Sequence, residues 1–371
     1  MTTFSDFDRH AMARALELAA LGATTTQPNP RVGCVIAKEG RIIGEGWHER
    51  AGGPHAEVVA LRAVAAGPGG LANARDSTVY VNLEPCSHHG RTPPCSDALV
   101  NARVGRVVFS IPDPNPKVAG RGAVLLTQAG IKVDMGLMET EAEELNLGYL
   151  KRRRKGTPFV RVKVGMSLDG RTALASGKSK WITSEAARED VQRWRASSAA
   201  VMTGIGTVLA DDPQLNVRLP DITRQPAVVV LDADARTPPT ARLFSGGGPV
   251  VVFTRDATMP GSAALRLKGA RVETVRGTGE LDLEAVLARL GDDELEVNEL
   301  LVEAGPTLTG SLVRHGLADE LLIYIAPKLV GPQGRPLFDL PQLEDLQQAQ
   351  AFQILETRQV GPDLRLRMRP D

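Results

Sequence analysis

Apolar segments typical of strands alternate with amphipathic segments typical of helices along almost the whole chain. The expected strands are 32–37, 78–83, 104–111, 159–164, 227–232, 250–254, 299–302 and 321–325, and the expected helices are 8–21, 56–66, 96–102, 184–196, 283–290 and 307–315. Strands and helices that alternate at this spacing usually form parallel pairs joined by crossover helices. The sequence therefore predicts an α/β protein with largely parallel sheets.

A basic run, KRRRK at 151–155, is followed by Gly-Thr-Pro and separates two such series of elements. A length of 371 residues suits two domains of ordinary size. Like charges followed by glycine and proline are typical of an exposed connector. We predict two domains, residues 1–150 and 157–371, joined by a solvated linker; a phosphate or RNA contact is the alternative role of the run.

Composition argues against several classes of protein. Basic and acidic residues number 44 each and aromatic residues make up 4%, so no global feature favours nucleic acid or an anionic membrane. No apolar run approaches the ~18 residues of a membrane span, and the acidic start is unlike a signal peptide. The three cysteines, an odd number, indicate a reducing compartment. We expect a cytoplasmic protein with no nucleic-acid or membrane partner.

The residues that bind metals best are concentrated near the N-terminus. All three cysteines (Cys34, Cys86 and Cys95) and four of the six histidines (His48, His55, His88 and His89) lie between residues 34 and 95. His55, Cys86 and Cys95 would supply one imidazole and two thiolates to a catalytic zinc ion, leaving the fourth place for water. Glu57, two residues after His55 at an expected helix start, would take the proton of that water.

The order of these residues is informative. H-x-E followed by P-C-x-x-C is the signature of zinc deaminases of nucleobases. In this chain eight residues, rather than two, separate Cys86 from Cys95, which points to a branch with a longer loop. The alternatives are a structural zinc site, with His88 or His89 as fourth ligand, and unrelated buried thiols. Cys34 is expected to be a small buried side chain, and His89 a surface residue.

Four strings, TQPNPRVGC (26–34), GWH (46–48), HAE (55–57) and EPCSHHGRTPPC (84–95), resemble the bacterial bifunctional diaminohydroxyphosphoribosylaminopyrimidine deaminase/reductases of riboflavin biosynthesis. The resemblance covers essentially the whole chain. It implies a cytidine-deaminase-like α/β/α domain, then a dihydrofolate-reductase-like α/β domain, with Zn²⁺ and NADPH as cofactors. It also implies a homo-oligomer and a small phosphorylated pyrimidine substrate, which first loses its 2-amino group by hydrolysis.

The resemblance also places the substrate contacts of the first reaction. They are Asn29, His48, His88, Arg91, Asp113 and Asn115. Arg91 stands where family members have lysine; it keeps the charge and can bind phosphate through two parallel hydrogen bonds. Taken alone, Asn29 and Asp113 are ordinary turn residues beside prolines.

The second half holds glycine-rich strings that need a different interpretation. Residues 204–209 lack the third glycine of the Rossmann fingerprint, because Leu209 occupies that position. The string EAGPTLTG (303–310) follows an expected strand and enters a helix, where free backbone N–H groups can hold a pyrophosphate. An ordinary Gly-Pro turn before a helix is the alternative.

These strings resemble the reductase domain of the same family, which binds NADPH without the Rossmann signature. The resemblance assigns to NADPH the residues Gly165, Trp181, Thr207, Asp211, Gly305, Pro306, Thr307, Leu308, Thr309, Gly310 and Ser311. It assigns to the substrate Ser179, Arg195, Leu215, Arg218 and Glu303, with the two arginines suited to the 5′-phosphate. The implied second reaction delivers hydride from NADPH to C1′ of the open-chain imine and yields a ribityl chain. The proton donor stays open between water, Glu303 and Asp211.

Two other functions are compatible with the sequence. One is a zinc deaminase of another nucleobase, free or in tRNA, followed by a C-terminal binding module, for which the basic run is the best support. The other is a scaffold or ligand-binding regulator with a structural zinc site, for which Glu57 would have no chemical role.

Overall fold

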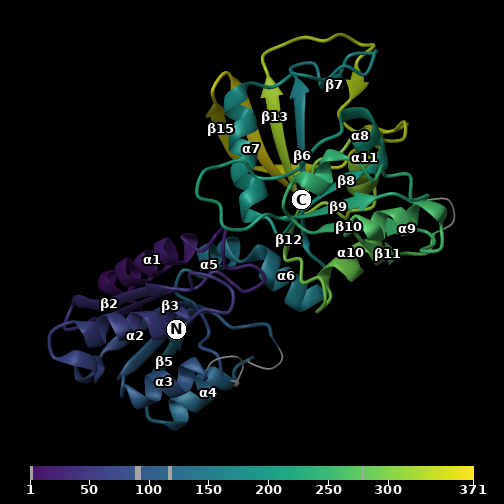
Figure 1. Cartoon of the computed structure of the whole chain (residues 1–371). Helices are drawn as coiled ribbons and strands as arrows, with labels where there is room; N and C mark the ends of the chain where they lie inside the picture. The colour runs from purple at the N-terminus through teal and green to yellow at the C-terminus, as the bar shows by residue number, and fades with distance from the viewer. Residues whose placement is uncertain (1–2, 88–92, 116–118, 278–279) are drawn as a thin grey trace. The chain divides into compact units, whose positions relative to one another are not determined.

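The computed structural model describes residues 3–87, 93–115, 119–277 and 280–371. The chain divides into two compact units, Met1–Gly156 and Thr157–Asp371, which are described separately. Figure 1 shows that strands lie at the centre of each unit with helices around them. None of the described helices combines the length and apolar character that crossing a membrane requires.

The basic run is not a linker, so that prediction was wrong. It forms the last turns of helix α6 (Leu147–Lys155), which belongs to the first unit. Arg152 is buried, and Gly156 ends the helix in the left-handed conformation with φ 74°. Basic residues are favourable at a helix C-terminus, and their long aliphatic stems can be covered by neighbouring side chains. A glycine after such a run therefore marks the end of a helix here.

The first unit is built around a five-stranded sheet with the order β2-β1-β3-β4-β5. Its elements are α1 (Asp6–Ala20), β1 (Gly33–Lys38), β2 (Arg41–Trp47), α2 (Ala56–Ala66), η1 (Gly70–Ala74), β3 (Thr78–Leu83), α3 (Cys95–Asn101), β4 (Arg106–Ile111), α4 (Arg121–Gln128), β5 (Lys132–Met135), α5 (Glu139–Leu145) and α6. β1 pairs antiparallel with β2 and β3, whereas β3, β4 and β5 run parallel. The expected parallel sheet is therefore only partly present. β2 was missed because a tight hairpin, with positive φ at Glu39 and Gly40, returns the chain directly.

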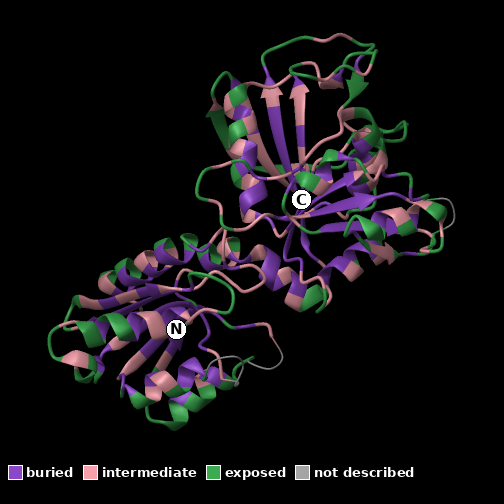
Figure 2. Cartoon of the chain, viewed as in Figure 1, coloured by how far each residue is buried: buried purple, intermediate pink, exposed green. Residues whose placement is uncertain are grey.

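Alternate residues of these strands supply two separate apolar layers. Side chains of one parity, including Cys34, Ile36, Val79 and Val107, pack with residues of α2, α3 and α4. Side chains of the other parity pack with α1 and the segment before α5: Val35, Ala37, Tyr80 and Val108. Figure 2 shows the central strands of both units as buried. The first unit is thus an α/β/α layer structure, as predicted.

A buried ionic network joins α1 to the sheet. Asp8 and Ser5 form a capping box at the start of α1. The Asp8 carboxylate also accepts hydrogen bonds from the Tyr80 hydroxyl at 2.8 Å and from Arg106 Nη1 at 2.6 Å. Burial of the carboxylate opposes its ionisation, but these hydrogen bonds outweigh that effect and lower the pKa of Asp8 to about 2.

This network predicts a pH-dependent difference between the wild type and Asp8→Asn. Because folding depresses the pKa of Asp8 from 3.8 to about 2, its ionisation stabilises the first unit fully above pH 3.8. That contribution, about 2 kcal/mol, disappears as the pH falls through about 2. Urea unfolding at pH 5 and pH 2, followed by hydrogen exchange of the β4 amides, measures it. A wild-type advantage that does not shrink at pH 2 would contradict the prediction.

The second unit is built around a nine-stranded sheet with the order β11-β10-β9-β8-β12-β6-β13-β16-β15. Its elements are β6 (Phe159–Ser167), β7 (Arg171–Ala173), α7 (Glu185–Ser197), β8 (Ala200–Gly204), α8 (Ile205–Asp211), β9 (Ala227–Leu231), η2 (Arg242–Ser245), β10 (Val250–Thr254), α9 (Pro260–Leu267), β11 (Arg271–Thr274), α10 (Leu283–Gly291), β12 (Glu299–Val302), α11 (Pro306–Arg314), β13 (Glu320–Ala326), β14 (Arg335–Pro336), η3 (Leu346–Gln348), β15 (Phe352–Val360) and β16 (Asp363–Pro370). The strands from β11 to β13 run parallel, and β16 and β15 join antiparallel. The expectation of a largely parallel sheet is confirmed for this unit.

Helices cover both faces of this sheet. Apolar residues of α10 and α11 pack on one face, and those of α7, α8 and α9 pack on the other. α8 follows β8 directly, and α11 begins four residues after β12, the neighbouring parallel strand. The ends of these strands therefore present loops and helix starts along one edge, which is where open α/β sheets bind their ligands.

Candidate active sites

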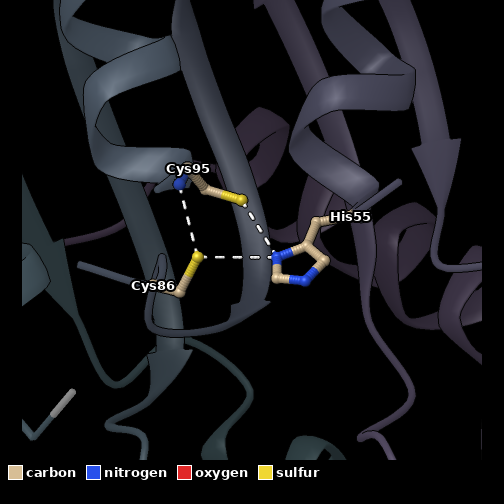
Figure 3. A group of neighbouring side chains, drawn as sticks. All are labelled: His55, Cys86 and Cys95. Carbon is tan, nitrogen blue, oxygen red and sulfur yellow. Dashed lines mark hydrogen bonds between the residues drawn. The ribbon is translucent and has the colours of Figure 1, made fainter. Parts of the chain in front are cut away.

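His55, Cys86 and Cys95 converge in the first unit (Figure 3). His55 is the residue that precedes α2, Cys86 lies shortly after β3, and Cys95 begins α3. The Nδ1 atom of His55 lies 3.2 Å from the Cys95 sulfur and 3.5 Å from the Cys86 sulfur. All three ligand atoms lie within 4.8 Å of one another. The structure thus brings the predicted ligand set together.

The arrangement fits a zinc ion. Ligand atoms placed tetrahedrally around zinc, with bonds of about 2.0 to 2.3 Å, lie about 3.3 to 3.8 Å apart. The Nδ1–sulfur distances in this site, 3.2 and 3.5 Å, are close to these values. One imidazole and two thiols form a known catalytic ligand set for this metal. Three protein ligands leave one coordination position for water or substrate.

Local interactions prepare the thiols for a metal. The hydrogen bond from the Cys95 thiol, together with the His55 ring and the Cys95 backbone amide, lowers the pKa of Cys86. The same Cys86 contact raises the pKa of Cys95, so the two thiols share a proton. The Cys86 contact also raises the pKa of His55. A cation placed among these atoms replaces the shared proton.

Glu57 lies beside the ligands but outside their set. It is in the first turn of α2 with an exposed fraction of 3%. Burial raises the pKa of its carboxyl, and the Cys95 thiol is within hydrogen-bonding reach. A buried carboxyl with a raised pKa next to an open metal position is the kind of group that transfers protons.

Two other predicted residues approach the same point. His48 Nε2 lies 3.0 Å from the side-chain nitrogen of Asn29, and His48 Nδ1 lies 2.9 Å from the carbonyl oxygen of Pro54. The carbonyl fixes the proton on Nδ1, so Nε2 accepts from Asn29. The ring of His48 stands edge-on to that of His55, with centroids 5.6 Å apart. Burial lowers the pKa of His48, which favours the neutral ring.

The remaining predicted contacts of the first site have different outcomes. Asp113 is buried after β4, and its carboxylate accepts from the Tyr149 hydroxyl at 2.9 Å and from the Asn115 amide at 2.9 Å. Burial raises the pKa of Asp113. His88 and Arg91 lie outside the described residues. Cys34 is fully buried in the apolar core, as predicted.

Glu84 is a residue that the sequence analysis missed. Its side chain is 3% exposed and accepts hydrogen bonds from three backbone amides, those of Asp113, Gly120 and Ala123. The signal in the sequence was its place in the EPC string, directly after an apolar strand and two residues before a metal ligand.

In the second unit, Arg195 of α7 and Glu303 form a buried ion pair. Two parallel hydrogen bonds join them, Nε to Oε1 at 2.5 Å and Nη2 to Oε2 at 3.0 Å. Arg195 Nη1 also donates to the backbone oxygen of Asn216, whose side chain accepts from Arg218 Nη1, each at 3.0 Å. Three of the predicted substrate residues are therefore brought together. Of the two arginines, Arg218 exposes its guanidinium to solvent, whereas Arg195 is already bound to Glu303.

Lys163 joins this cluster and was not predicted. It lies in β6, and its ammonium is 3.9 Å from Glu303 Oε2. Burial lowers the pKa of Lys163. Burial also opposes ionisation of Glu303, but Arg195 outweighs it and the pKa of Glu303 falls to about 2. Glu303 is thus a carboxylate at neutral pH. A lysine within the predicted strand at 159–164 was the available signal.

The residues assigned to NADPH lie along the edge of the sheet where the parallel strands end. Gly165 is in β6, Thr207 and Asp211 are in α8, and residues 305–311 form the start of α11. Gly305 precedes the helix in extended conformation, and Pro306 is its first residue. The free amides at this helix start suit a pyrophosphate.

Contacts between loops bring the other assigned residues to the same edge. The ammonium of Lys180, between Ser179 and Trp181, lies 3.7 Å from Asp211 Oδ1 in α8. Lys328 donates to the backbone oxygen of Trp181 at 3.1 Å. Trp181 is 64% exposed, and the Arg188 guanidinium lies 4.4 Å from the centroid of its ring.

The last two assigned residues, Gly310 and Leu215, lie in closely packed surroundings. A Cβ at Gly310 would lie 2.5 Å from the backbone oxygen of Asp339, so α11 approaches that segment closely and only glycine fits. The side chain of Leu215, beside Asn216, is buried in the apolar core.

Comparison with known families agrees with both units. Residues 5–111 match the cytidine and deoxycytidylate deaminase zinc-binding region, and residues 158–366 match the RibD C-terminal domain. The chain is therefore a bifunctional enzyme that joins a zinc-dependent deaminase to an NADPH-dependent reductase. It belongs to the RibD family of riboflavin-biosynthesis proteins. The predicted family and fold class are confirmed.

Individual relatives match over nearly their full length. The riboflavin biosynthesis protein RibD of Escherichia coli K12 is 50% identical over 97% of this chain and 99% of its own. The structure of Acinetobacter baumannii RibD, form 1, superposes with a TM-score of 0.91 at 45% identity and covers 98% of this chain and 99% of that one. A Thermotoga maritima diaminohydroxyphosphoribosylaminopyrimidine deaminase/5-amino-6-(5-phosphoribosylamino)uracil reductase reaches a TM-score of 0.87 at 32% identity, with 98% and 99% covered.

Proposed function

We propose that the chain first deaminates 2,5-diamino-6-ribosylamino-4(3H)-pyrimidinone 5′-phosphate and then reduces the ribosyl side chain of the product to ribityl. Residues 1–150 would carry the first reaction and residues 157–371 the second. The observation that carries the proposal is the convergence of His55, Cys86 and Cys95 beside the buried carboxyl of Glu57. The names of the relatives support the substrate.

In the deamination, zinc supplies the positive charge that lowers the pKa of a water molecule. Glu57 accepts a proton from the attacking water and delivers it to the departing 2-amino nitrogen. Asn29 and His48 are proposed to orient the pyrimidine. Because the Asn29 side-chain nitrogen donates to His48, its oxygen is the atom proposed to accept from a substrate N–H. Asp113 and Asn115 are proposed to contact the sugar or the base, and His88 and Arg91 the ribose phosphate.

In the reduction, NADPH supplies the hydride. Arg218, exposed beside the ion pair, is the proposed anchor of the 5′-phosphate. Arg195 holds Glu303 in one orientation, so that its carboxylate presents a fixed acceptor to the substrate. With its pKa at about 2, Glu303 is ionised at neutral pH and accepts rather than donates a proton. The side-chain nitrogen of Lys163 lies 3.9 Å from Glu303 Oε2, so this lysine is the second basic group beside that carboxylate after Arg195.

The cofactor side of the reductase is proposed from its position. Gly165, Trp181, Thr207 and Asp211, with residues 305–311, surround the ends of β6, β8 and β12. Ser179 and Leu215 complete the proposed substrate side. We also propose that the enzyme is a homo-oligomer and acts in the cytoplasm, which rests on the resemblance alone.

A single incubation tests both activities. The purified protein is mixed with the diaminopyrimidinone ribosyl phosphate and NADPH, and ammonia and NADPH absorbance are followed together. We expect ammonia release followed by NADPH oxidation. Cys86→Ser should abolish ammonia release but leave NADPH oxidation intact when the deaminated compound is supplied. Loss of both activities in that variant would contradict the division of work between the two units.

A further inference from the structure

Neither metal binding nor proton transfer explains the hydrogen bonds that the buried Glu84 carboxylate accepts. It directly follows β3, and its carboxylate receives the backbone N–H groups of Asp113 at 3.3 Å, Gly120 at 3.0 Å and Ala123 at 3.2 Å. These amides come from the turn after β4 and from the start of α4. One buried carboxylate therefore joins the end of β3, the end of β4 and the start of α4 at the edge of the sheet.

A second contact joins the same segments. A Cβ placed on Gly122 in the first turn of α4 would lie 2.1 Å from the backbone oxygen of Pro85 and 3.2 Å from Glu84 Oε1. The helix therefore touches the backbone of the turn that carries Cys86, and only glycine permits this approach. The start of α4 is held from two sides, by backbone packing and by the carboxylate.

Further hydrogen bonds hold the turn at Asp113. Its carboxylate is bound by the Tyr149 hydroxyl and by the amide of Asn115, whose backbone oxygen in turn accepts from the Ala119 amide at 3.0 Å. Hydrogen bonds from backbone amides to a carboxylate are stronger than those between neutral groups, and burial strengthens them further. Glu84 links this ordered turn to a point two residues from a metal ligand.

We propose that Glu84 is a positioning residue of the deamination, which fixes the Asp113–Asn115 turn and the start of α4 relative to the Cys86 turn. This inference rests on the proposed function, in which Asp113 and Asn115 contact the substrate. Glu84 acts through these residues on substrate binding, whereas the metal and Glu57 carry out the chemistry. Its removal should therefore affect KM rather than kcat.

The test is Glu84→Gln, which keeps the shape of the side chain but turns an NH₂ group towards backbone donors. We expect KM for the diaminopyrimidinone substrate to rise at least tenfold, with kcat within about twofold of the wild type and zinc content unchanged. Amide hydrogen exchange at the start of α4 should accelerate. Asp169→Asn is the matched control, because Asp169 accepts from the Val330 and Gly331 amides in the second unit. It should leave the KM of deamination unchanged.

The outcomes separate this inference from the proposed function. A wild type that releases no ammonia contradicts the proposed function. A wild type that releases ammonia and an unchanged KM in Glu84→Gln contradict only the role of Glu84, and so does loss of zinc in that variant. If Glu84→Gln fails to fold, Gly122→Ala disturbs the same contact with Glu84 intact and should raise KM in the same way. An unchanged KM in Gly122→Ala, or failure of both variants to fold, overturns the inference.

Discussion

Glu57→Gln should lower the rate of ammonia release by at least about a thousandfold, the range that a positioned general acid and base contributes. The amide has the size of the carboxyl but neither accepts the proton of water nor returns one to the leaving nitrogen. Zinc content should stay at the wild-type value, because Glu57 lies outside the ligand set. Oxidation of NADPH with the deaminated compound should also be unchanged. Ammonia, zinc and NADPH are each measured on the same preparation.

Glu49→Gln is the control for this experiment. Glu49 is exposed in the same unit, one residue from His48, so its substitution changes charge near the site without touching the ligands. It should retain full deamination. Ammonia release that persists in Glu57→Gln would remove the proposed proton transfer from this residue. A wild type that binds zinc, releases no ammonia and is unaffected by Glu57→Gln would favour a structural zinc site.

The metal site could be predicted because its residues lie in short sequence segments whose local structure is predictable. His55 and Glu57 lie at the start of a helix whose predicted range, 56–66, is the observed one, and Cys86 follows a strand predicted at 78–83, again as observed. Apolar periodicity fixed these two elements, and few residue types bind zinc. Their convergence then followed from the ordinary packing of a helix on a sheet.

The antiparallel end of the second sheet was not predicted. β16 alternates leucine and methionine with arginine, a pattern of period two that the sequence analysis did not use, and its three arginines resemble an exposed surface when taken alone. In the structure these guanidinium groups are paired: Arg365 binds Asp190 at 2.7 Å, and Arg367 binds Glu320 at 2.8 Å. The partners come from distant parts of the chain. A short sequence segment does not reveal ion pairs whose partners come together only after folding.

The same limit applies to the candidate sites. Glu84 and Lys163 were missed because their partners are backbone amides or side chains far along the chain. Arg195 and Glu303 were both assigned to the substrate, but their direct bond to each other was not foreseen. Sequence similarity identifies which residues gather at a site. The geometry decides which of them face a ligand and which hold their neighbours.

The ion pair between Arg195 and Glu303 predicts a large effect of Glu303→Gln on both activity and stability. We expect loss of NADPH oxidation and a decrease of about 3 kcal/mol in the free energy of unfolding of the second unit, because a buried guanidinium loses its counter-charge. Both side chains are about 12% exposed or less, so solvent screens the charge poorly. Urea unfolding, followed by hydrogen exchange of the β12 amides, measures the stability. Ammonia release by the first unit should be unchanged.

A double variant separates the structural role of this pair from its role in the reaction. Arg195→Met with Glu303→Leu removes both charges and replaces them with apolar groups of similar length, which restores most of the stability lost in Glu303→Gln. It should still oxidise no NADPH, because the fixed carboxylate is absent. Activity in this double variant would show that neither side chain contacts the substrate. A Glu303→Gln variant that is as stable as the wild type but inactive would assign Glu303 to the reaction alone.

The pH dependence of stability gives an independent check. Because folding depresses the pKa of Glu303 from 4.5 to about 2, the contribution of its ionisation to the free energy of unfolding is complete above pH 4.5 and is lost as the pH falls through about 2.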